Sequence, residues 1–153
     1  MKTQKIVLGI DGSEGAGHAT RWVAKLAADI DAEVVAVHAI EMPVTRGDVY
    51  ASTAWFDEHW RDDITRTVEE DWCQPFRDGG IKYRAELVEG SPTKMLHELA
   101  RRESADMIVV GKRGLGGFRE FLLGSVSHEL VHHSDVPVVV VPPERRTTKK
   151  EAS

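Results

Sequence analysis

The regular alternation of short apolar runs with longer amphipathic segments constrains this chain more than any other feature. Five runs have the length and composition of β-strands: KIVLGI (5–10), EVVAVHA (33–39), IKYRAELV (81–88), DMIVVG (106–111) and PVVVV (137–141). Four of them are almost continuous Val, Ile and Leu, which is typical of strands covered on both faces. The run at 81–88 instead alternates apolar with charged residues, so we expect it at an edge of the sheet, with one side exposed to solvent.

Three of the segments beside these runs have clear helical signals. Ser13 is a candidate N-cap for a helix of about four turns, whose apolar residues recur at spacings of three and four: Ala19, Trp22, Val23, Leu26, Ala27 and Ile30. A later helix is expected to have Ser91 as its N-cap and Pro92 in its first position. A last, short helix should run from Ser125 to about Ser134.

Residues 53–78 are also expected to be mostly helical. One side of this segment carries a row of apolar residues: Phe56, Trp60, Ile64, Val68 and Trp72. Pro75 should kink or end the helix, and Gly79 and Gly80 should stop it. We favour a place in the core for the aromatic residues, and a lid over a site or a docking patch is the alternative for those at 55–60.

Strands and helices in this order predict an α/β fold with a single doubly wound, five-stranded, mostly parallel sheet, right-handed crossovers and helices on both faces. The 153 residues suffice for one domain, which we place at 1–143, with a charged and disordered tail at 144–153. Ligands bind such sheets beyond the carboxyl ends of the strands, where the strand order reverses. Two strand ends are suited to this role, GIDGSEGAG after the first run and GKRGLGG after the fourth.

Charge and cysteine content argue against several classes of protein. The 20 Lys and Arg against 25 Asp and Glu give a net charge of −5, which argues against general binding of nucleic acids or anionic membranes. The single cysteine, Cys73, excludes an internal disulfide and suits a reducing compartment. The start MKTQKIVLGIDG lacks the apolar region of a signal peptide, and every apolar run is shorter than the roughly 20 residues that cross a bilayer. We therefore expect a cytoplasmic protein.

Glycines are concentrated in the stretch GKRGLGGFREFLLGSVS, at 111–127. Its spacing matches neither the P-loop nor the G-x-G-x-x-G pattern. The stretch nevertheless follows a buried strand and ends in Gly124 and a candidate capping hydroxyl on Ser125, at the start of a helix whose unpaired amides and dipole favour an anion. Lys112 and Arg113 add positive charge. From these residues alone, a phosphate site and a long turn that uses glycines for positive φ angles are equal alternatives.

The spacing G-x2-G-x9-G-[ST], formed by Gly111, Gly114, Gly124 and Ser125, resembles the ATP-binding signature of the universal stress protein family. The resemblance extends from KIVLGIDGSEGAGHATRWVAKLA to GSVSHELVHHSDVPVVVVPP, nearly the whole domain. It implies the Rossmann-like fold of the adenine nucleotide alpha hydrolases and a protein that binds ATP or another adenine nucleotide and acts in stress response or dormancy as a nucleotide-dependent switch. It also implies a homodimer paired through the last strand, Val136–Val141, whose apolar edge would need cover.

The resemblance places the nucleotide between the first and fourth strands. Asp11 corresponds to the acidic residue at the adenosine end, and Ala39 to the position whose backbone contacts adenine. The glycines of the signature line the ribose and the phosphates, and Mg²⁺ is implied on the phosphates without a dedicated protein cage. The implied nucleotide-binding residues are Gly9, Ile10, Asp11, Ala39, Gly111, Lys112, Arg113, Gly114, Gly124, Ser125 and Val126.

Other functions stay open on the sequence. A cyclic-AMP-binding protein, a module that binds no nucleotide and a slow ATP hydrolase fit the same fold, but DGSEGAGH contains neither the S-G-G-x-D-S nor the H-x-G-H motif of related enzymes. No catalytic residue is therefore assigned. His128 and His132 have the spacing of a metal pair without a third ligand nearby in the sequence, so an exposed histidine cluster is favoured. His38 is expected to be a satisfied histidine of the core or rim rather than a base.

Overall fold

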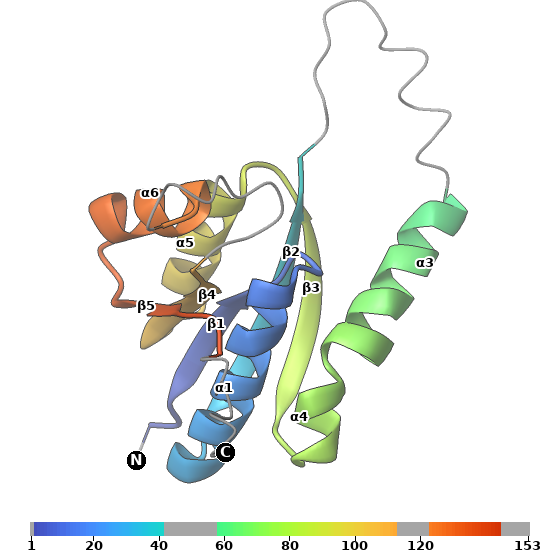
Figure 1. Ribbon diagram of the computed structural model, residues 1–153, viewed down its shortest axis with the longest axis horizontal. Coiled ribbons are helices and arrows are strands. Elements are labelled where there is room, and N and C mark those ends of the chain that lie inside the picture. Colours follow the sequence, from blue (N-terminus) through green and yellow to red (C-terminus); the bar gives the residue numbers. More distant parts are fainter. Residues whose placement is uncertain (1, 42–57, 113–122, 145–153) are drawn as a thin grey trace, which may run out of the picture.

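The computed structural model in Figure 1 describes residues 2–41, 58–112 and 123–144. The strands are β1 (Lys5–Gly9), β2 (Glu33–Ile40), β3 (Tyr83–Glu89), β4 (Met107–Gly111) and β5 (Val138–Val141). The helices are α1 (Glu14–Ile30), α3 (Glu58–Thr67), the π-helical turn η1 (Val68–Trp72), α4 (Gln74–Asp78), α5 (Pro92–Arg102) and α6 (Ser125–His133). All five predicted strands are present, with bounds that differ from the prediction by one or two residues.

The five strands form one parallel sheet in the order β3-β2-β1-β4-β5. The chain builds outward from β1 to β2 and β3, and then crosses to the other side of β1 for β4 and β5. The strand order therefore reverses between β1 and β4, and the predicted doubly wound fold is confirmed. The alternating run forms β3 at one edge of the sheet, as predicted, and β5 forms the other edge.

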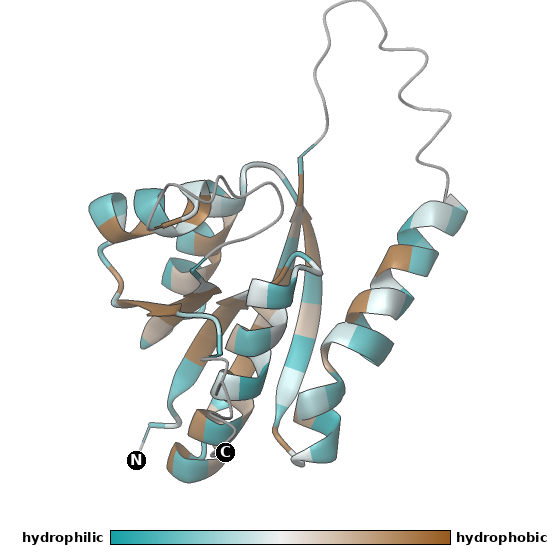
Figure 2. Ribbon diagram, in the orientation of Figure 1, coloured by the Kyte–Doolittle hydropathy of each residue, from teal (hydrophilic) through white to brown (hydrophobic). Residues whose placement is uncertain are grey.

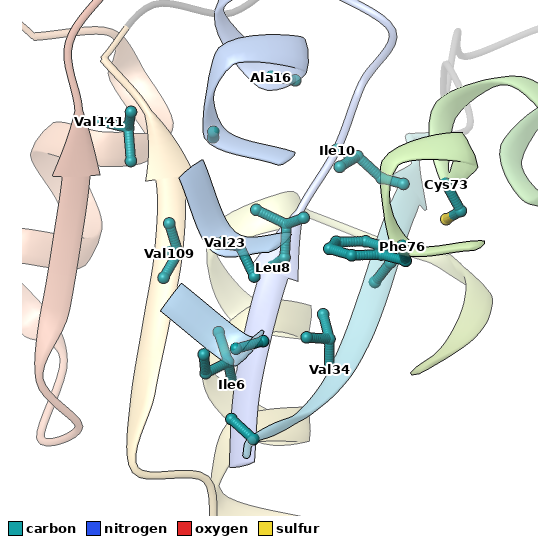
Figure 3. Packing of buried hydrophobic residues seen from close by; sticks show 14 of the residues in the cluster. Ile6, Leu8, Ile10, Ala16, Val23, Val34, Cys73, Phe76, Val109 and Val141 are labelled. Carbon is teal, nitrogen blue, oxygen red and sulfur yellow. The ribbon is translucent and has the colours of Figure 1, made fainter. Parts of the chain in front are cut away.

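Each face of the sheet has its own apolar cluster, because successive strand residues point to opposite faces. Helix α1 and the η1–α4 segment cover one face. The apolar cluster on this face includes Ile6, Leu8, Val23, Val34, Phe76 and Val109 (Figure 3). Helices α5 and α6 cover the other face, where it includes Val7, Val35, Leu96, Leu99, Ile108 and Leu130. The hydrophobic colour follows the central strands, whereas the helices are banded, as expected for helices with one buried side (Figure 2).

Helix α1 is capped as predicted, since the Ser13 hydroxyl accepts a hydrogen bond from the Ala16 amide at 3.1 Å. Its buried residues are Ala16, Ala19, Thr20, Val23 and Ala27. Trp22 and Ile30, which belong to the same three-and-four spacing, are each 40% exposed. The small side chains on the buried side of α1 allow the helix to pack close to the sheet. The larger side chains of Trp22 and Ile30 lie at the edge of this buried side and stay partly exposed.

The segment 53–78, predicted to be mostly helical, forms three helical pieces between Glu58 and Asp78, and 53–57 lie outside the described residues. Helix α3 passes into η1, where the Cys73 amide donates to the Val68 carbonyl at 3.0 Å, an i→i+5 bond. Four residues turn an α-helix by about 40° more than one full turn. Apolar residues spaced four apart, like those predicted for one side of this segment, therefore move gradually around a regular helix. The π-turn has more residues per turn and reverses part of this rotation. Pro75 lies in the first turn of α4 rather than at a helix end.

The remaining boundaries agree with the prediction. Helix α4 ends before Gly79, and Gly80 has a φ angle of +62°. Helix α5 begins at Pro92, with Ser91 as its N-cap residue. None of the helices in the described ranges has both the length and the hydrophobicity needed to cross a membrane.

The first residue of the predicted tail contacts the domain. The Glu144 carboxylate lies 3.4 Å from Nδ1 of His18 and 3.6 Å from the Arg21 guanidinium, both on α1. The chain therefore continues past β5 to reach α1 at this residue. The rest of the predicted tail, 145–153, lies outside the described residues.

Candidate functional site

The carboxyl ends of β1 and β4 lie side by side where the strand order reverses (Figure 1). The two strands pair in parallel from Ile6 with Met107 to Leu8 with Val109. The turn to α1 follows β1 directly, and Lys112 follows β4. The structure therefore brings together the two strand ends that the sequence singled out. Ligands of doubly wound sheets bind at this position.

Residues 10–13 form a tight turn between β1 and α1. Oδ1 of Asp11 accepts a hydrogen bond from the Ser13 amide at 2.9 Å, and Ser13 in turn caps α1. Gly12 has a φ angle of +78°, which favours glycine. Asp11, predicted at the adenosine end of a nucleotide, therefore also shapes the turn in which it lies.

Gly111, at the end of β4, packs against the backbone of α1. A Cβ atom on Gly111 would lie 2.6 Å from the Gly15 carbonyl oxygen and 3.1 Å from the Ala16 amide nitrogen. Backbone atoms cannot move aside unless the helix shifts, so close packing of α1 requires glycine here. The contact of Gly111 with a nucleotide, which the resemblance implies, stays a prediction. Gly9 similarly leaves room for Cδ1 of Leu96, which would lie 2.9 Å from a Cβ.

The two described ends of the glycine-rich stretch are bonded to each other. The Lys112 carbonyl accepts hydrogen bonds from the Gly124 amide at 2.7 Å and from the Ser127 hydroxyl at 3.2 Å. The Lys112 amide donates to the Val141 carbonyl at 2.9 Å and extends the pairing of β4 with β5. Ser127 is buried, and the sequence did not identify it as part of the site. The only sequence signal for this role was a hydroxyl on the side of a short helix that faces the core. These bonds hold the start of α6 beside the end of β4.

Gly124 is the N-cap residue of α6, with φ −67° and ψ 166°. Ser125 is therefore the first residue inside the helix, and the prediction that its hydroxyl caps α6 was wrong. Because a glycine N-cap has no side chain, it offers no side-chain oxygen to the first amides of the helix. Those amides lack acceptors within the helix and lie at the positive end of its dipole. Ser125 is exposed and Val126 is half-buried, so the predicted phosphate residues lie together at an end suited to an anion.

Two aromatic side chains border the site on the β2 side. Nδ1 of His38 lies 2.9 Å from the Ile10 carbonyl oxygen, and because a carbonyl can only accept, Nδ1 carries the proton. The His38 ring meets the Trp72 ring at 89°, with centroids 5.1 Å apart. The indole also covers the β1–α1 turn, since a Cβ on Gly12 would lie 2.4 Å from Cζ2 of Trp72. His38 is the satisfied histidine that we expected, whereas Trp72 had been assigned only to the apolar side of a helix.

The other predicted site residues are placed in part. Ala39 lies near the carboxyl end of β2, where it pairs with Val88 of β3, and it is half-buried. Arg113 and Gly114 lie outside the described residues, as do Trp55 and Phe56 of the proposed lid or patch.

The histidines and the cysteine of the described residues are further candidates for a metal or nucleophilic site. Within the described ranges, no group of three or more His, Cys, Asp or Glu side chains is placed to hold a metal ion. The rings of His128 and His132 lie against each other, with centroids 4.5 Å apart. Burial raises the pKa of the Cys73 thiol to about 11, which keeps it protonated at neutral pH and a poor nucleophile.

A groove of about 710 Å³ lies away from the strand-order reversal, between the η1–α4 segment and the first residues of β3. Its lining residues are Glu69, Glu70, Arg77, Tyr83, Arg84 and Ala85. The Arg77 guanidinium already donates to the Glu69 and Glu70 carbonyl oxygens. We therefore place the candidate site at the carboxyl ends of β1 and β4 and not in this groove.

Fold and site together define a doubly wound α/β protein whose candidate site combines a tight turn after β1 with a glycine-capped helix N-terminus after β4. The sequence model described as the Universal stress protein family matches residues 2–142. The chain therefore belongs to the universal stress protein family.

Individual relatives agree with this assignment. Universal stress protein MJ0531 of Methanocaldococcus jannaschii is 30% identical over 146 residues, which cover 90% of this chain and 81% of the relative. Among solved structures, hypothetical protein MJ0577 is 26% identical, with a TM-score of 0.74 over 95% of this chain and 99% of that one. A universal stress protein solved in complex with cAMP is also 26% identical, with a TM-score of 0.63 over 94% of this chain and 100% of that one.

Proposed function

We propose that this protein binds adenine nucleotides, and ATP in particular, between the carboxyl ends of β1 and β4. The single observation that carries the proposal is the position of the α6 N-terminus. The bonds from Gly124 and Ser127 to the Lys112 carbonyl hold it beside the end of β4, where the strand order reverses. A helix N-terminus at such a position attracts phosphate through its free amides and its dipole.

The chemistry around α6 supports phosphate at this end of the site. Ser125 adds an exposed hydroxyl at the first helical position, and Lys112 adds a half-buried cation at the end of β4. Gly124 has an extended backbone that any residue can adopt, so glycine is not needed there for conformation. We assign the glycine at this position to close approach of a ligand to the backbone.

Relatives support an adenine nucleotide as the ligand. One similar universal stress protein was solved in complex with cAMP. In this chain, Asp11 and Ala39 lie at the ends of β1 and β2, on the side of the site away from α6, where the adenosine part of a nucleotide would lie. Mg²⁺ would be bound mainly by the phosphate oxygens, which is the usual arrangement for this ion with nucleotides.

Isothermal titration of the purified protein with Mg-ATP tests the proposal. Gly124→Ala should weaken ATP binding by at least about ten-fold, because its Cβ occupies the approach of a phosphate. The extended backbone at Gly124 accepts alanine, so the thermal melt of this variant should match that of the unaltered protein. Gly17→Ala is the matched control, since its Cβ would meet only Arg21 Nη1, at an ordinary 3.6 Å. If the unaltered protein binds no ATP up to about 1 mM, the proposal is wrong.

Competition between ATP and cAMP distinguishes the two adenine ligands. The two share the adenosine part and differ in the number and geometry of their phosphate oxygens. We expect ATP to displace cAMP, because only an extended phosphate chain reaches from the β1 side of the site to the α6 amides. Tighter binding of cAMP would assign the site to the cyclic nucleotide.

The proposal extends to the setting in which the protein acts. We propose a cytoplasmic homodimer, paired through Val136–Val141, in which the domain at 1–143 changes partner or conformation with its bound nucleotide during stress or dormancy. The lone cysteine and the net charge of −5 support this setting. We assign no catalytic residue, so any ATP hydrolysis should be slow.

A further inference from the structure

Trp72 lies at the site although it belongs to a helical segment that otherwise covers the sheet. Its indole lies against the backbone of Gly12 in the β1–α1 turn and meets the His38 ring edge to face. Trp72 and His38 are both half-buried, and Gly12 is exposed. The indole therefore packs against the turn of the candidate site, and part of its surface stays exposed.

Contacts of neighbouring residues flank this side chain in both directions along the chain. On the N-terminal side, Arg61 of α3 forms an ion pair with Glu89 at the end of β3. On the C-terminal side, Arg77 of α4 donates to two carbonyl oxygens of η1, those of Glu69 and Glu70. The π-turn lies between these anchors, and π-turns within helices occur frequently at functional sites because they redirect side chains.

The two sides of the site differ in chemistry. The α6 side offers backbone amides, a hydroxyl and the positive end of a helix dipole, all of which suit phosphate. The β2 side offers the two aromatic rings of His38 and Trp72, packed perpendicular to each other. An aromatic surface suits the flat face of a base, and stacking on such a surface depends on the area of the base.

We propose that the indole of Trp72 forms the wall against which the base of the bound nucleotide packs, and that Trp72 thereby sets a preference for purine over pyrimidine nucleotides. The inference rests on the proposed nucleotide-binding function and adds a specificity-determining residue to it. Base selectivity then belongs to the η1 turn, whereas the glycine-containing strand ends bind the ribose and phosphates. Loss of the indole should weaken base binding and leave phosphate binding intact.

Isothermal titrations with ATP, UTP and tripolyphosphate separate the base from the phosphates. Trp72→Ala should weaken ATP binding by about ten-fold, with tripolyphosphate affinity changed by less than about two-fold. The preference for ATP over UTP should fall by a similar factor. Trp72→Phe keeps an aromatic face and should restore most of the ATP affinity. Trp22→Phe, at a 40% exposed position on α1, is the matched control and should change none of the three affinities.

Fluorescence provides a second measurement that does not depend on the alanine variant folding. The chain has four tryptophans, and ATP should change the emission of the unaltered protein while tripolyphosphate does not. The ATP-dependent change should disappear in Trp72→Phe and persist in Trp22→Phe.

The outcomes distinguish the inference from the proposed function. Equal loss of ATP and tripolyphosphate affinity in Trp72→Ala would mean that the indole only supports the fold of the site, and unchanged ATP affinity would mean that it does not touch the base. Either result overturns the inference and leaves nucleotide binding in place. Absence of ATP binding by the unaltered protein overturns both.

Discussion

The glycines around this site meet three different physical requirements. Gly12 has a positive φ angle of +78°, and an indole covers the place of its missing side chain. Gly111 needs no unusual backbone conformation, but the backbone of α1 occupies the place where its Cβ would lie. Gly124 has an ordinary extended backbone. A glycine-rich pattern in a sequence therefore does not say which glycines contact a ligand, and Gly124 is the described glycine that we propose for ligand approach.

This distinction predicts the effect of Gly111→Ala on stability. Its Cβ would lie 2.6 Å from the Gly15 carbonyl oxygen, so α1 must shift away from β4. We expect a loss of about 2 kcal/mol in the free energy of unfolding, typical of overpacking. Gly17→Ala, on the same helix and without such a contact, should instead stabilise by about 0.5 kcal/mol through helix propensity. Urea unfolding of both variants measures the difference, and equal stabilities would show that α1 does not pack on Gly111 this closely.

At the scale of elements, the amino ends of the strands are joined by charged side chains. Glu103, between α5 and β4, accepts a hydrogen bond from the Lys5 ammonium of β1 at 3.1 Å and pairs with Arg84 of β3. Glu33 of β2 lies 3.9 Å from the same Arg84 guanidinium. The Glu103 side chain is only 16% exposed, so solvent screens these contacts less than it screens an open surface pair.

The pH dependence of stability should depend on this carboxylate. The hydrogen bond from Lys5, with the pairing to Arg84, lowers the pKa of Glu103 below its ordinary value of 4.5. A lowered pKa in the folded state stabilises the fold above the ordinary pKa, and this contribution is lost as the pH falls through the lowered value. Glu103→Gln should therefore cost about 1.5 kcal/mol near pH 7, and the difference from the unaltered protein should shrink below pH 4.5.

Urea unfolding across this pH range, with Glu98→Gln as the control, measures the effect. Glu98 pairs with Lys94 at 3.9 Å on the exposed side of α5, with 56% of its side chain exposed. Such an exposed pair contributes about 0.3 kcal/mol. If Glu103→Gln has an effect as small as Glu98→Gln near pH 7, the charged group does not join the strands energetically.

The sequence predicted the strands and helices more reliably than it predicted how their side chains pack. Continuous apolar runs and the alternation at 81–88 predicted the strands and the edge position of β3, because strand burial is encoded by local pattern. The π-turn was not predicted, because the apolar spacing of this segment indicates a helix but does not distinguish an i→i+4 bond from the i→i+5 bond that the Cys73 amide donates to the Val68 carbonyl. The place of Trp72 in the site follows from that turn, so a search for motifs alone could not find it.

At the scale of the whole molecule, the sheet has one apolar edge. β5 ends the strand order, and three of its four valines are half-buried. The Ile108 amide donates to the Pro137 carbonyl and the Lys112 amide to the Val141 carbonyl, so the backbone groups of Pro137 and Val141 face β4. Backbone groups of alternate residues point to opposite sides of a strand, so the amides and carbonyls of Val138 and Val140 face away from the sheet. A second copy of β5 could pair with them across a two-fold axis.

This alternation gives a sharp test of the proposed homodimer. Val140→Pro removes an outward amide that a partner strand would use, and proline is tolerated at a sheet edge when its nitrogen faces away from the ladder. Val139→Pro removes the amide on the β4 side and should instead lower the stability of the chain by about 3 kcal/mol. Light scattering after size exclusion should give twice the 17.0 kDa chain mass for the unaltered protein and close to 17.0 kDa for Val140→Pro. Strand pairing across β5 cannot tolerate both the loss of the Val140 amide and the proline ring in its place. A Val140→Pro variant that folds and still has the doubled mass would therefore place the dimer contact elsewhere on the molecule.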